Sequence, residues 1–275
     1  MVSLLGVCLL LFVAVGLSSN RAAIRLRTVL LAFGLQGGIG FVALWTDWGI
    51  AALAAASEYV AALLGYSRAG MEFMFGGLVG TSDSLGFVFA FNVLPVVIFF
   101  SSLIAVLYHA RVMQWMIRIL GGGLRKLLGT SHTESLSAAA NVFVGQAEAP
   151  LVVRPYIPSM TQSELFAVMV GGMASIAGSV MAGYVALGVP LEYLLAASFM
   201  AAPGGLLMAK LIEPEVDQPA EPAQGEKLAT EQYVNFIDAA ATGAMNGLQM
   251  AGAIGAMLLA FIALIAMVNG ILGAG

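Results

Sequence analysis

One apolar segment, residues 133–157, carries a carboxylate and an amide at its centre, in the run Gly145-Gln146-Ala147-Glu148-Ala149-Pro150. A charged side chain inside a membrane is costly, so Glu148 is expected to face a cavity or a partner. Gln146 offers both a donor and an acceptor. Together the two side chains could bind the polar edge of a neutral planar ligand, such as a nucleobase or its sugar. An ion pair between Glu148 and Arg154, or a tip that lies in water, would explain the same residues.

A second pair of polar side chains, Asn141 and Ser175, could hold a hard monovalent cation. Such an ion prefers oxygen ligands, and unwound backbone supplies carbonyls beside side-chain oxygens. The carbonyls of Val144 and Ile176 would complete a site between a hairpin tip and a broken helix. Small polar residues also form hydrogen bonds between helices in bundles, and spacing alone favours this second interpretation.

Other classes of function find less support. A membrane serine hydrolase would need a Ser–His pair, and Ser175 with His132 is the candidate. His132 is expected at the cytoplasmic start of the hairpin and Ser175 at mid-depth, which argues against catalysis. A passive pore would need a polar stripe along several helices, which the sequence does not show. A membrane protein that binds nucleoside without transporting it would keep Gln146 and Glu148, so that alternative stays open. We do not predict an enzyme.

The elements that must position these residues are short or interrupted helices. Each half of the segment 133–157 is about ten residues, too short to cross a bilayer, which predicts a re-entrant hairpin. Ser131 and Glu134 have the spacing of a capping box that starts it, and Thr161 and Glu164 repeat this spacing. The second box opens a span over 162–188. Small residues at 171–179 predict that this span is broken, which a membrane tolerates only beside protein or a wet cavity.

Composition places these elements in a membrane. Of the 275 residues 60% are hydrophobic and 9% are charged, far fewer charges than the roughly 25% of a soluble domain. The net charge of -4 gives no basic stripe, so no nucleic-acid partner is predicted. Residues 50–82 mix Ala-rich helix with charges and indicate an interfacial excursion. Segments long enough to span are 2–18, 29–49, 85–108, 162–188, 190–211 and 243–270.

The basic residues predict the orientation. They fall in the first loop, after the third span and near the acidic, Pro-rich loop, at Arg21, Arg25, Arg27, Arg111, Arg118, Arg125, Lys126, Arg154, Lys210 and Lys227. If all of these are cytoplasmic, the N-terminus is outside and only Arg68 violates the positive-inside rule. Residues 111–126 would then form an amphipathic helix in the cytoplasmic interface.

Two runs closely resemble motifs of the concentrative nucleoside transporters, the sodium/nucleoside cotransporter family. The run that resembles the first hairpin of that family is Asn141-Val142-Phe143-Val144-Gly145-Gln146-Ala147-Glu148-Ala149-Pro150-Leu151, followed by Val152-Val153-Arg154-Pro155-Tyr156. The run that resembles its broken fourth helix is Gly171-Gly172-Met173-Ala174-Ser175-Ile176-Ala177-Gly178. The resemblance covers the whole chain, which corresponds to the N-terminal two-thirds of the family's length.

The resemblance implies an all-α polytopic membrane protein, a homotrimer in the cell inner membrane that works by an elevator-like alternating access. Its core would be two inverted repeats, of which the first maps to 85–211. The implied domains are scaffold helices and an interfacial segment at 1–82, and the gate-like first repeat at 83–212. An acidic cytoplasmic loop at 213–232 and the first span of the C-terminal region at 233–275 would follow.

The family also implies roles for the candidate residues. Positions that match Gln146 and Glu148 contact the nucleobase, Val180 matches a position lining the base site, and Gly145 and Ala147 belong to the same substrate-binding run. Positions that match Asn141, Val144, Ser175 and Ile176 bind sodium, whereas some members of the family use protons. All four match here, which favours sodium as the coupling ion, with no other cofactor.

Two departures from the family pattern matter. The family usually has Ser or Thr where this chain has Ala147, which removes a hydroxyl near the base. The chain ends at Gly275, after the first span of the second repeat, so the resemblance implies a truncated form that lacks most of that repeat. We therefore predict sodium-coupled uptake of a uridine-like nucleoside for the family member from which this sequence comes.

Overall fold

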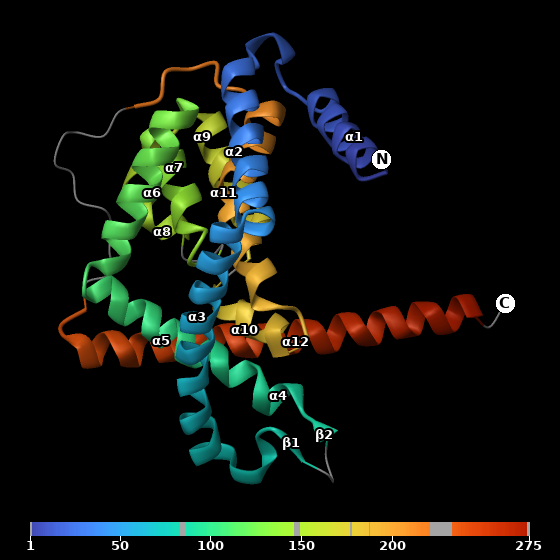
Figure 1. Cartoon of the computed structure of the whole chain (residues 1–275), viewed down its shortest axis with the longest axis vertical. Coiled ribbons are helices and arrows are strands. Elements are labelled where there is room, and N and C mark those ends of the chain that lie inside the picture. Colours follow the sequence, from blue (N-terminus) through green and yellow to red (C-terminus); the bar gives the residue numbers. More distant parts are fainter. Residues whose placement is uncertain are drawn as a thin grey trace. The chain divides into compact units, whose positions relative to one another are not determined.

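The computed structural model describes residues 2–82, 86–145, 149–176, 178–186, 188–220 and 233–273. Within these ranges the chain is mostly helical, as predicted (Figure 1). The strands among the described residues are β1 (Thr81–Ser82) and β2 (Gly86–Phe87), which pair antiparallel. The prediction of an all-α chain is therefore wrong in one detail, because the chain also has this pair of strands of two residues each.

The chain forms two compact units. Unit 1 comprises Met1–Glu58, Arg111–Met181 and Pro190–Gln232, and unit 2 comprises Tyr59–Ala110, Ala182–Val189 and Tyr233–Gly275. The helices α3 (Asp47–Phe75) and α10 (Gly178–Ala186) contribute residues to both units. The residues proposed above for the base and cation sites that the structure describes belong to unit 1.

Five helical segments among the described residues are long and apolar enough to cross a membrane. They are Leu26–Trp45 (α2), Asp47–Leu78 (α3 with the short helix η2, Gly76–Leu78), Phe89–His109 (α4, Phe89–Asn92, with α5, Leu94–His109), Leu191–Ile212 (α11) and Phe236–Gly273 (α12). Four of them overlap the predicted spans 29–49, 85–108, 190–211 and 243–270. The first predicted span, 2–18, corresponds to the shorter helix α1 (Val2–Gly16), which precedes the short helix η1 (Arg21–Ala23).

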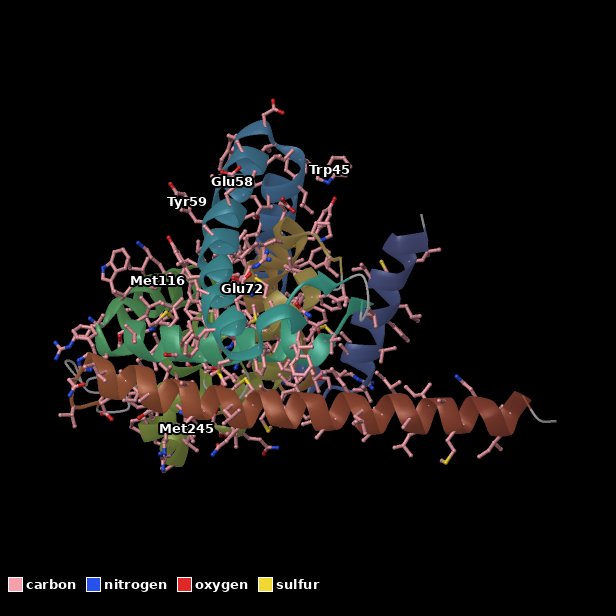
Figure 2. All side chains as sticks on the ribbon, turned by 90° about the horizontal axis from the view of Figure 1, so that it is seen from below. Trp45, Glu58, Tyr59, Glu72, Met116 and Met245 are labelled. Atoms are coloured by element: carbon pink, nitrogen blue, oxygen red, sulfur yellow. The ribbon has the colours of Figure 1, made fainter. Side chains whose placement is uncertain are left out.

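For residues 50–82 the sequence predicts an interfacial excursion between two spans, but in the structure α3 runs without a break to Phe75. Arg68 and Glu72 lie one turn apart on this helix and form an exposed ion pair of 2.6 Å, so these charges are compatible with a continuous helix. Figure 2 labels Glu58, Tyr59 and Glu72 along this helix. An interfacial location for the segment stays a prediction.

The core of unit 1 is a cluster of helices around α7 (His132–Ala140). This helix packs on α6 (Val112–Leu128) and α9 (Gln162–Ala174), while α11 packs on α9 and α2. Every residue of α7 from Thr133 to Ala140 is buried. Gly121 of α6 allows the close approach, because a Cβ there would lie 2.9 Å from Leu136 Cδ2 and 3.2 Å from Ser135 O. Helix α6 is amphipathic, as predicted for 111–126, and its location in the interface stays a prediction.

Unit 2 is built on the contact between α5 and α12. The buried residues of α12, namely Ala239, Gly243, Gly247 and Ala251, recur every four residues and so form one stripe. A Cβ on Gly243 would lie 2.6 Å from Ala105 Cβ, and one on Gly247 would lie 2.7 Å from Ile98 Cα. Small residues let two helix backbones approach closely, which is the usual basis of helix association in membranes. The Ser102 hydroxyl also donates to the Ala240 carbonyl at 2.9 Å.

We predict that Gly247→Ala weakens the packing of α5 on α12 by about 1–3 kcal/mol, because the added methyl would meet backbone of α5. The measurement is the apparent Tm of the purified protein in detergent. Gly252→Ala is the matched control, since a Cβ at this exposed position of α12 meets nothing within 4 Å. Equal Tm values for the two variants would contradict the α5–α12 contact described here.

Candidate functional site

The two helices that lead to the candidate site both begin with a capping box. At α7 the Ser131 hydroxyl accepts from Glu134 N at 3.3 Å, and Glu134 Oε1 accepts from Ser131 N at 2.5 Å. At α9 the Thr161 hydroxyl accepts from Glu164 N at 3.1 Å, and Glu164 Oε2 accepts from Thr161 N at 2.9 Å. Both capping boxes predicted from the sequence are confirmed.

Both elements are interrupted, as the sequence predicted, but α7 ends at Ala140, before the run 145–150 where its interruption was predicted. Helix α7 is followed by turns at residues 141–144, and the chain becomes helical again at α8 (Ala149–Val152) and η3 (Arg154–Ser159). Helix α9 ends at Ala174, Ser175 is extended, and α10 begins at Gly178. The break in the second element is thus narrower than the predicted 171–179, because Gly171 to Ala174 remain helical. The depth of both breaks in a membrane stays a prediction.

The structure brings Asn141 and Ser175 together at these two helix ends. The Ser175 hydroxyl donates to Asn141 Oδ1 at 3.4 Å and lies at the same distance from the Gly172 carbonyl. The Asn141 amide donates to the Ser137 carbonyl at 3.1 Å, and the side chain is buried. A distance of 3.4 Å is long for an O–H···O bond, whose usual length is about 2.7–2.8 Å. The two side-chain oxygens therefore lie side by side with only a weak bond between them.

The other predicted site residues of unit 1 lie on the segments beside this contact. Val144 and Gly145 are buried in the turn after Asn141, whereas Ile176 and Val180 are partly buried at the second break. The carbonyls of Val144 and Ile176 stay predicted ligands. Gln146, Ala147 and Glu148 lie outside the described residues, and so does the alternative ion pair of Glu148 with Arg154.

Close packing holds the turn after α7 against α9 and α11. A Cβ on Gly171 of α9 would lie 3.1 Å from Asn141 Nδ2, so the glycine leaves room for the amide. Helices α11 and α9 also approach closely, since a Cβ on Gly205 of α11 would lie 3.3 Å from Gly171 Cα. The ring of Phe143 meets that of Phe199 of α11 edge-on, with centroids 6.2 Å apart. The turn after α7 is thus held on two neighbouring helices.

The geometry argues against the hydrolase alternative. His132 begins α7, and Asn141, which contacts Ser175, follows the other end of that helix. Nine residues of helix separate the two ends by roughly 13 Å at 1.5 Å a residue. A catalytic Ser–His pair must lie within hydrogen-bond reach, about 2.6–3.2 Å. Ser175 and His132 therefore form no catalytic pair.

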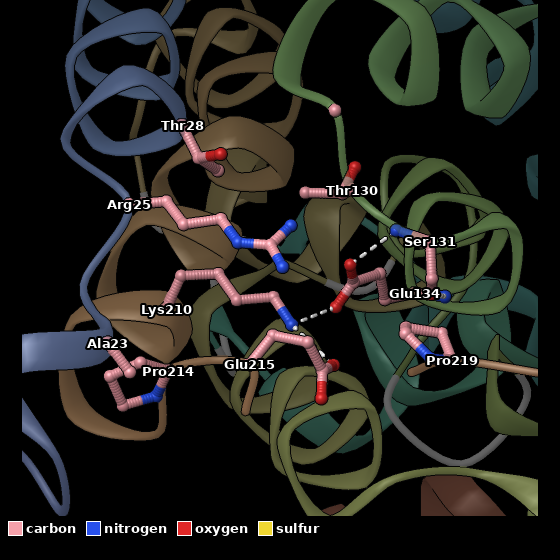
Figure 3. Close-up of a pocket in the computed structure, with 11 residues that line it drawn as sticks. Ala23, Arg25, Thr28, Thr130, Ser131, Glu134, Lys210, Pro214, Glu215 and Pro219 are labelled. Carbon is pink, nitrogen blue, oxygen red and sulfur yellow. Dashed lines mark hydrogen bonds and ion pairs between the residues drawn. The ribbon is translucent and has the colours of Figure 1, made fainter. Parts of the chain in front are cut away.

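A buried ionic cluster lies at the opposite ends of α7 and α9, and the sequence did not predict it (Figure 3). The Lys210 ammonium lies 2.6 Å from Glu134 Oε2, 2.8 Å from Ser163 Oγ and 3.5 Å from Glu215 Oε2. Burial raises the pKa of Glu134 above its ordinary value, while the nearby Lys210 charge acts in the opposite direction. The available signal was a lysine in the last turn of an apolar helix, followed by Glu213 and Glu215. The positive-inside rule uses this lysine only as a topological charge.

Three family descriptions match successive parts of the chain. Residues 5–78 match the family described as "Na+ dependent nucleoside transporter N-terminus", residues 90–191 match "Nucleoside recognition", and residues 193–275 match "Na+ dependent nucleoside transporter C-terminus". The chain is 51% identical to "Uncharacterized transporter YutK" of Bacillus subtilis, over 98% of this chain and 67% of the relative. It is 47% identical to "Nucleoside permease NupC" of Helicobacter pylori, over 97% of this chain and 64% of the relative.

Solved structures of a transporter named CNTnw are also similar to the chain. Its inward-facing substrate-bound state matches with a TM-score of 0.92 and 55% identity, over 99% of this chain and 65% of that protein. Its outward-facing state, in a substituted form, matches with a TM-score of 0.93 and 55% identity over the same share of this chain and 66% of that protein. The chain thus spans about two-thirds of the length of these relatives.

We predict that Ser131→Ala loosens the start of α7 and costs about 1 kcal/mol, because it removes the side-chain half of the capping box. Hydrogen exchange of the amides at 132–135 is the measurement, and exchange there should become faster. Ser131→Thr is the control, since threonine also caps helices. Equal exchange in the Ala and Thr variants would show that the cap does not hold this helix end.

Proposed function

Because the chain belongs to the family of Na⁺-dependent nucleoside transporters, we propose that the full-length protein takes up nucleosides by coupling their entry to sodium. The observation that carries this proposal is the Asn141–Ser175 contact at two helix breaks. In transporters, interrupted helices near the bilayer midplane supply backbone carbonyls and side-chain oxygens to the coupling ion. Two of the four residues inferred to bind sodium meet at that position here.

The sodium site is inferred to use Asn141 Oδ1, Ser175 Oγ and the carbonyls of Val144 and Ile176. The 3.4 Å bond between the two side-chain oxygens is weak enough for a cation to replace it. Ser137, which accepts from the Asn141 amide, orients the amide so that its oxygen faces Ser175. Oxygen ligands of this kind suit a hard cation. Simple hydrogen bonding between helices is the competing explanation, and it predicts no effect of these side chains on sodium dependence.

The nucleoside site is inferred to lie at the tip between α7 and α8. Gln146 and Glu148 would bind the polar edge of the base, with Gly145, Ala147 and Val180 beside it. A carboxylate with this role forms a charge-assisted hydrogen bond to the ligand, which is stronger than a neutral one. The proposed substrate is a uridine-like nucleoside, and the family resemblance is the ground for this choice. Ala147 lacks the hydroxyl that the family usually has near the base, so this position does not itself select between purine and pyrimidine bases.

Transport would follow an alternating-access cycle. The similar transporter CNTnw has structures named as inward-facing and outward-facing, which supports two accessible states for this chain too. We infer that α7, α8 and η3 form a re-entrant hairpin, and that it belongs with the broken helix α9–α10 to the first of two inverted repeats. A homotrimer in the inner membrane, with the N-terminus outside and residues 213–232 in the cytoplasm, completes the proposal.

The test is uridine accumulation by proteoliposomes that hold the full-length protein. Accumulation should depend on an inward sodium gradient and disappear when an ionophore dissipates that gradient. Accumulation driven by a proton gradient alone would show that protons, and not sodium, are the coupling ion. Uridine binding without accumulation would instead identify a membrane nucleoside-binding protein, the second function that the sequence left open.

We predict that Asn141→Ala and Ser175→Ala each raise the sodium concentration for half-maximal uptake by about tenfold, the effect of losing one bond of about 1.5 kcal/mol to a charged group. The effect on uptake should be smaller at saturating sodium. Ser198→Ala is the control, because it removes a buried hydroxyl that bonds only within α11. Sodium dependence like that of the parent in both variants would place the cation site elsewhere.

We further predict that Glu148→Gln lowers the affinity for uridine about tenfold or more, because it replaces a charge-assisted hydrogen bond worth about 1.5–3 kcal/mol. Equilibrium binding to the purified protein is the measurement. Glu58→Gln, at an exposed position of α3, is the control for the same chemical change. Unchanged affinity in the Glu148 variant would favour the ion pair with Arg154 over a role in binding.

A further inference from the structure

The ionic cluster around Lys210 joins three elements of unit 1 that are far apart in the sequence. An ammonium has three N–H donors, and Lys210 faces an acceptor on each element: Glu134 of α7, Ser163 of α9 and Glu215 of the segment 213–220. Figure 3 shows Lys210 between Glu134 and Glu215, with Arg25 beside them. One buried ammonium therefore connects α11 to both helices that lead to the candidate sodium site, by an ion pair to Glu134 and a hydrogen bond to Ser163.

Three further hydrogen bonds, two of them to carboxylates, reinforce the same connections. The Thr133 hydroxyl of α7 donates to Glu164 Oε1 of α9 at 2.5 Å, which links the two capping boxes directly. The Thr161 hydroxyl donates to Glu215 Oε2 at 2.9 Å, and the Ser163 hydroxyl donates to the Glu213 carbonyl at 2.6 Å. Glu134 and Glu164 are 2% and 1% exposed, so water screens these bonds little.

Stability alone does not account for such a cluster. Removing buried charges from water is costly, and replacement of a buried ion pair by apolar residues of similar volume is often neutral or stabilising. Breaking one partner of such a pair is strongly destabilising. What a buried ion pair does provide is a single geometry, because only one arrangement satisfies all of its groups. Such a fixed geometry controls the distance between other parts of the elements that the ion pair joins.

The controlled distance is that between Asn141 and Ser175. Helices α7 and α9 have 9 and 13 residues, and are roughly 13 and 20 Å long at 1.5 Å a residue. The cluster holds their first turns together, and the Asn141–Ser175 contact joins their far ends. A tilt of about 10° at the first turn would move the far end of the longer helix by roughly 3 Å. That shift would separate two oxygens that now lie 3.4 Å apart.

We propose that Lys210 is a positioning residue for the sodium site, acting through α7 and α9 without contacting the ion. The proposal rests on the proposed sodium site at Asn141 and Ser175, and it adds a residue from the opposite end of both helices. Loss of the Lys210 ammonium frees the first turns of α7 and α9 to tilt independently, and the ion ligands then meet in their binding geometry for a smaller fraction of the time.

The first experiment compares Lys210→Met with Lys126→Met, the same change at an exposed lysine of α6. In sodium-driven uridine uptake by the full-length protein, Lys210→Met is expected to raise the sodium concentration for half-maximal uptake at least about fivefold, within the range of coupling between connected residues. The uridine concentration for half-maximal uptake at saturating sodium should stay within about twofold of the control. Lys210→Arg keeps the charge and should restore most of the sodium dependence.

The second experiment separates positioning from stability. Glu134→Gln retains the capping box, because Gln also serves at this position of the motif, but it removes the buried charge. Combined with Lys210→Met, it should recover much of the apparent Tm lost in Lys210→Met, since no uncompensated carboxylate remains at position 134. The sodium dependence should nevertheless stay shifted, because the tie between the helices is still absent. Recovery of Tm and sodium dependence together would show a merely structural role and overturn the proposal.

A third measurement does not require transport. In sodium-free detergent, amides of residues 137–145 should exchange at least about threefold faster in Lys210→Met than in Lys126→Met. Equal exchange would contradict the positioning role of Lys210 even if the protein transports sodium and nucleoside. A parent protein without sodium-stimulated uptake would instead contradict the proposed function. If Lys210→Met does not fold, Glu134→Gln alone is measured in the same assays. A sodium dependence equal to that of the parent protein would then overturn the proposal.

Discussion

The ends of α7 and α9 leave backbone carbonyls without partners in their own helices, inside an otherwise apolar part of the chain. The last four carbonyls of any helix have no intrahelical donor, and in an apolar setting they must find another. At α7 the Ala139 and Ala140 carbonyls accept from backbone amides of the following turn, and the Asn141 side chain gives the Ser137 carbonyl a second donor. At α9 the Ser175 hydroxyl lies near the Gly172 carbonyl. The residues that follow each helix therefore supply donors to its last carbonyls. A cation that binds oxygen ligands would complete the same arrangement.

Small residues make this arrangement possible because they allow backbones to meet. Lipid offers no hydrophobic drive for helix association, so packing depends on close contact. Gly121 brings α6 against α7, Gly171 leaves room for the Asn141 amide, and Gly205 brings α11 against α9. Helix α7 can then be buried along its length although it carries polar side chains such as Ser135 and Ser137, which are buried with it. Unit 2 uses the same principle at Gly243 and Gly247 of α12.

Sequence reasoning succeeded where local chemistry determined the structure. Both capping boxes and the breaks after Ala140 and Ala174 depend on residues a few positions apart, and each was located within a few residues. The extent of α3 was not foreseen, because its charges at Arg68 and Glu72 suggested an excursion although they pair within one helix. Asn141 and Ser175 were recognised as a pair only through the family motif, since spacing alone favoured simple packing between helices.

The ionic cluster escaped prediction for a different reason. Its bonds join residues from four separate segments, and no local pattern relates Lys210 to Glu134 or Ser163. A lysine near the end of an apolar helix is ordinarily a topological charge whose head reaches the interface. Here the residue is 8% exposed and its side chain is turned into the protein, a placement that depends on how α7, α9 and α11 pack. Tertiary packing of this kind cannot be inferred from one sequence.

The two ends of α7 and α9 thus have opposite energetic character. At the first turns, hydrogen bonds of 2.5–2.9 Å involve charged and buried groups, and such bonds are strong, so a ligand does not readily displace them. At the far ends, the contact between Asn141 and Ser175 is 3.4 Å long and neutral, so an ion can replace it at little cost. A binding site is most responsive when its ligands are held by a rigid support but weakly engaged with one another. The distribution of bond strengths along these two helices meets both conditions, because the strong bonds are concentrated at the first turns and the weak contact lies at the proposed sodium site.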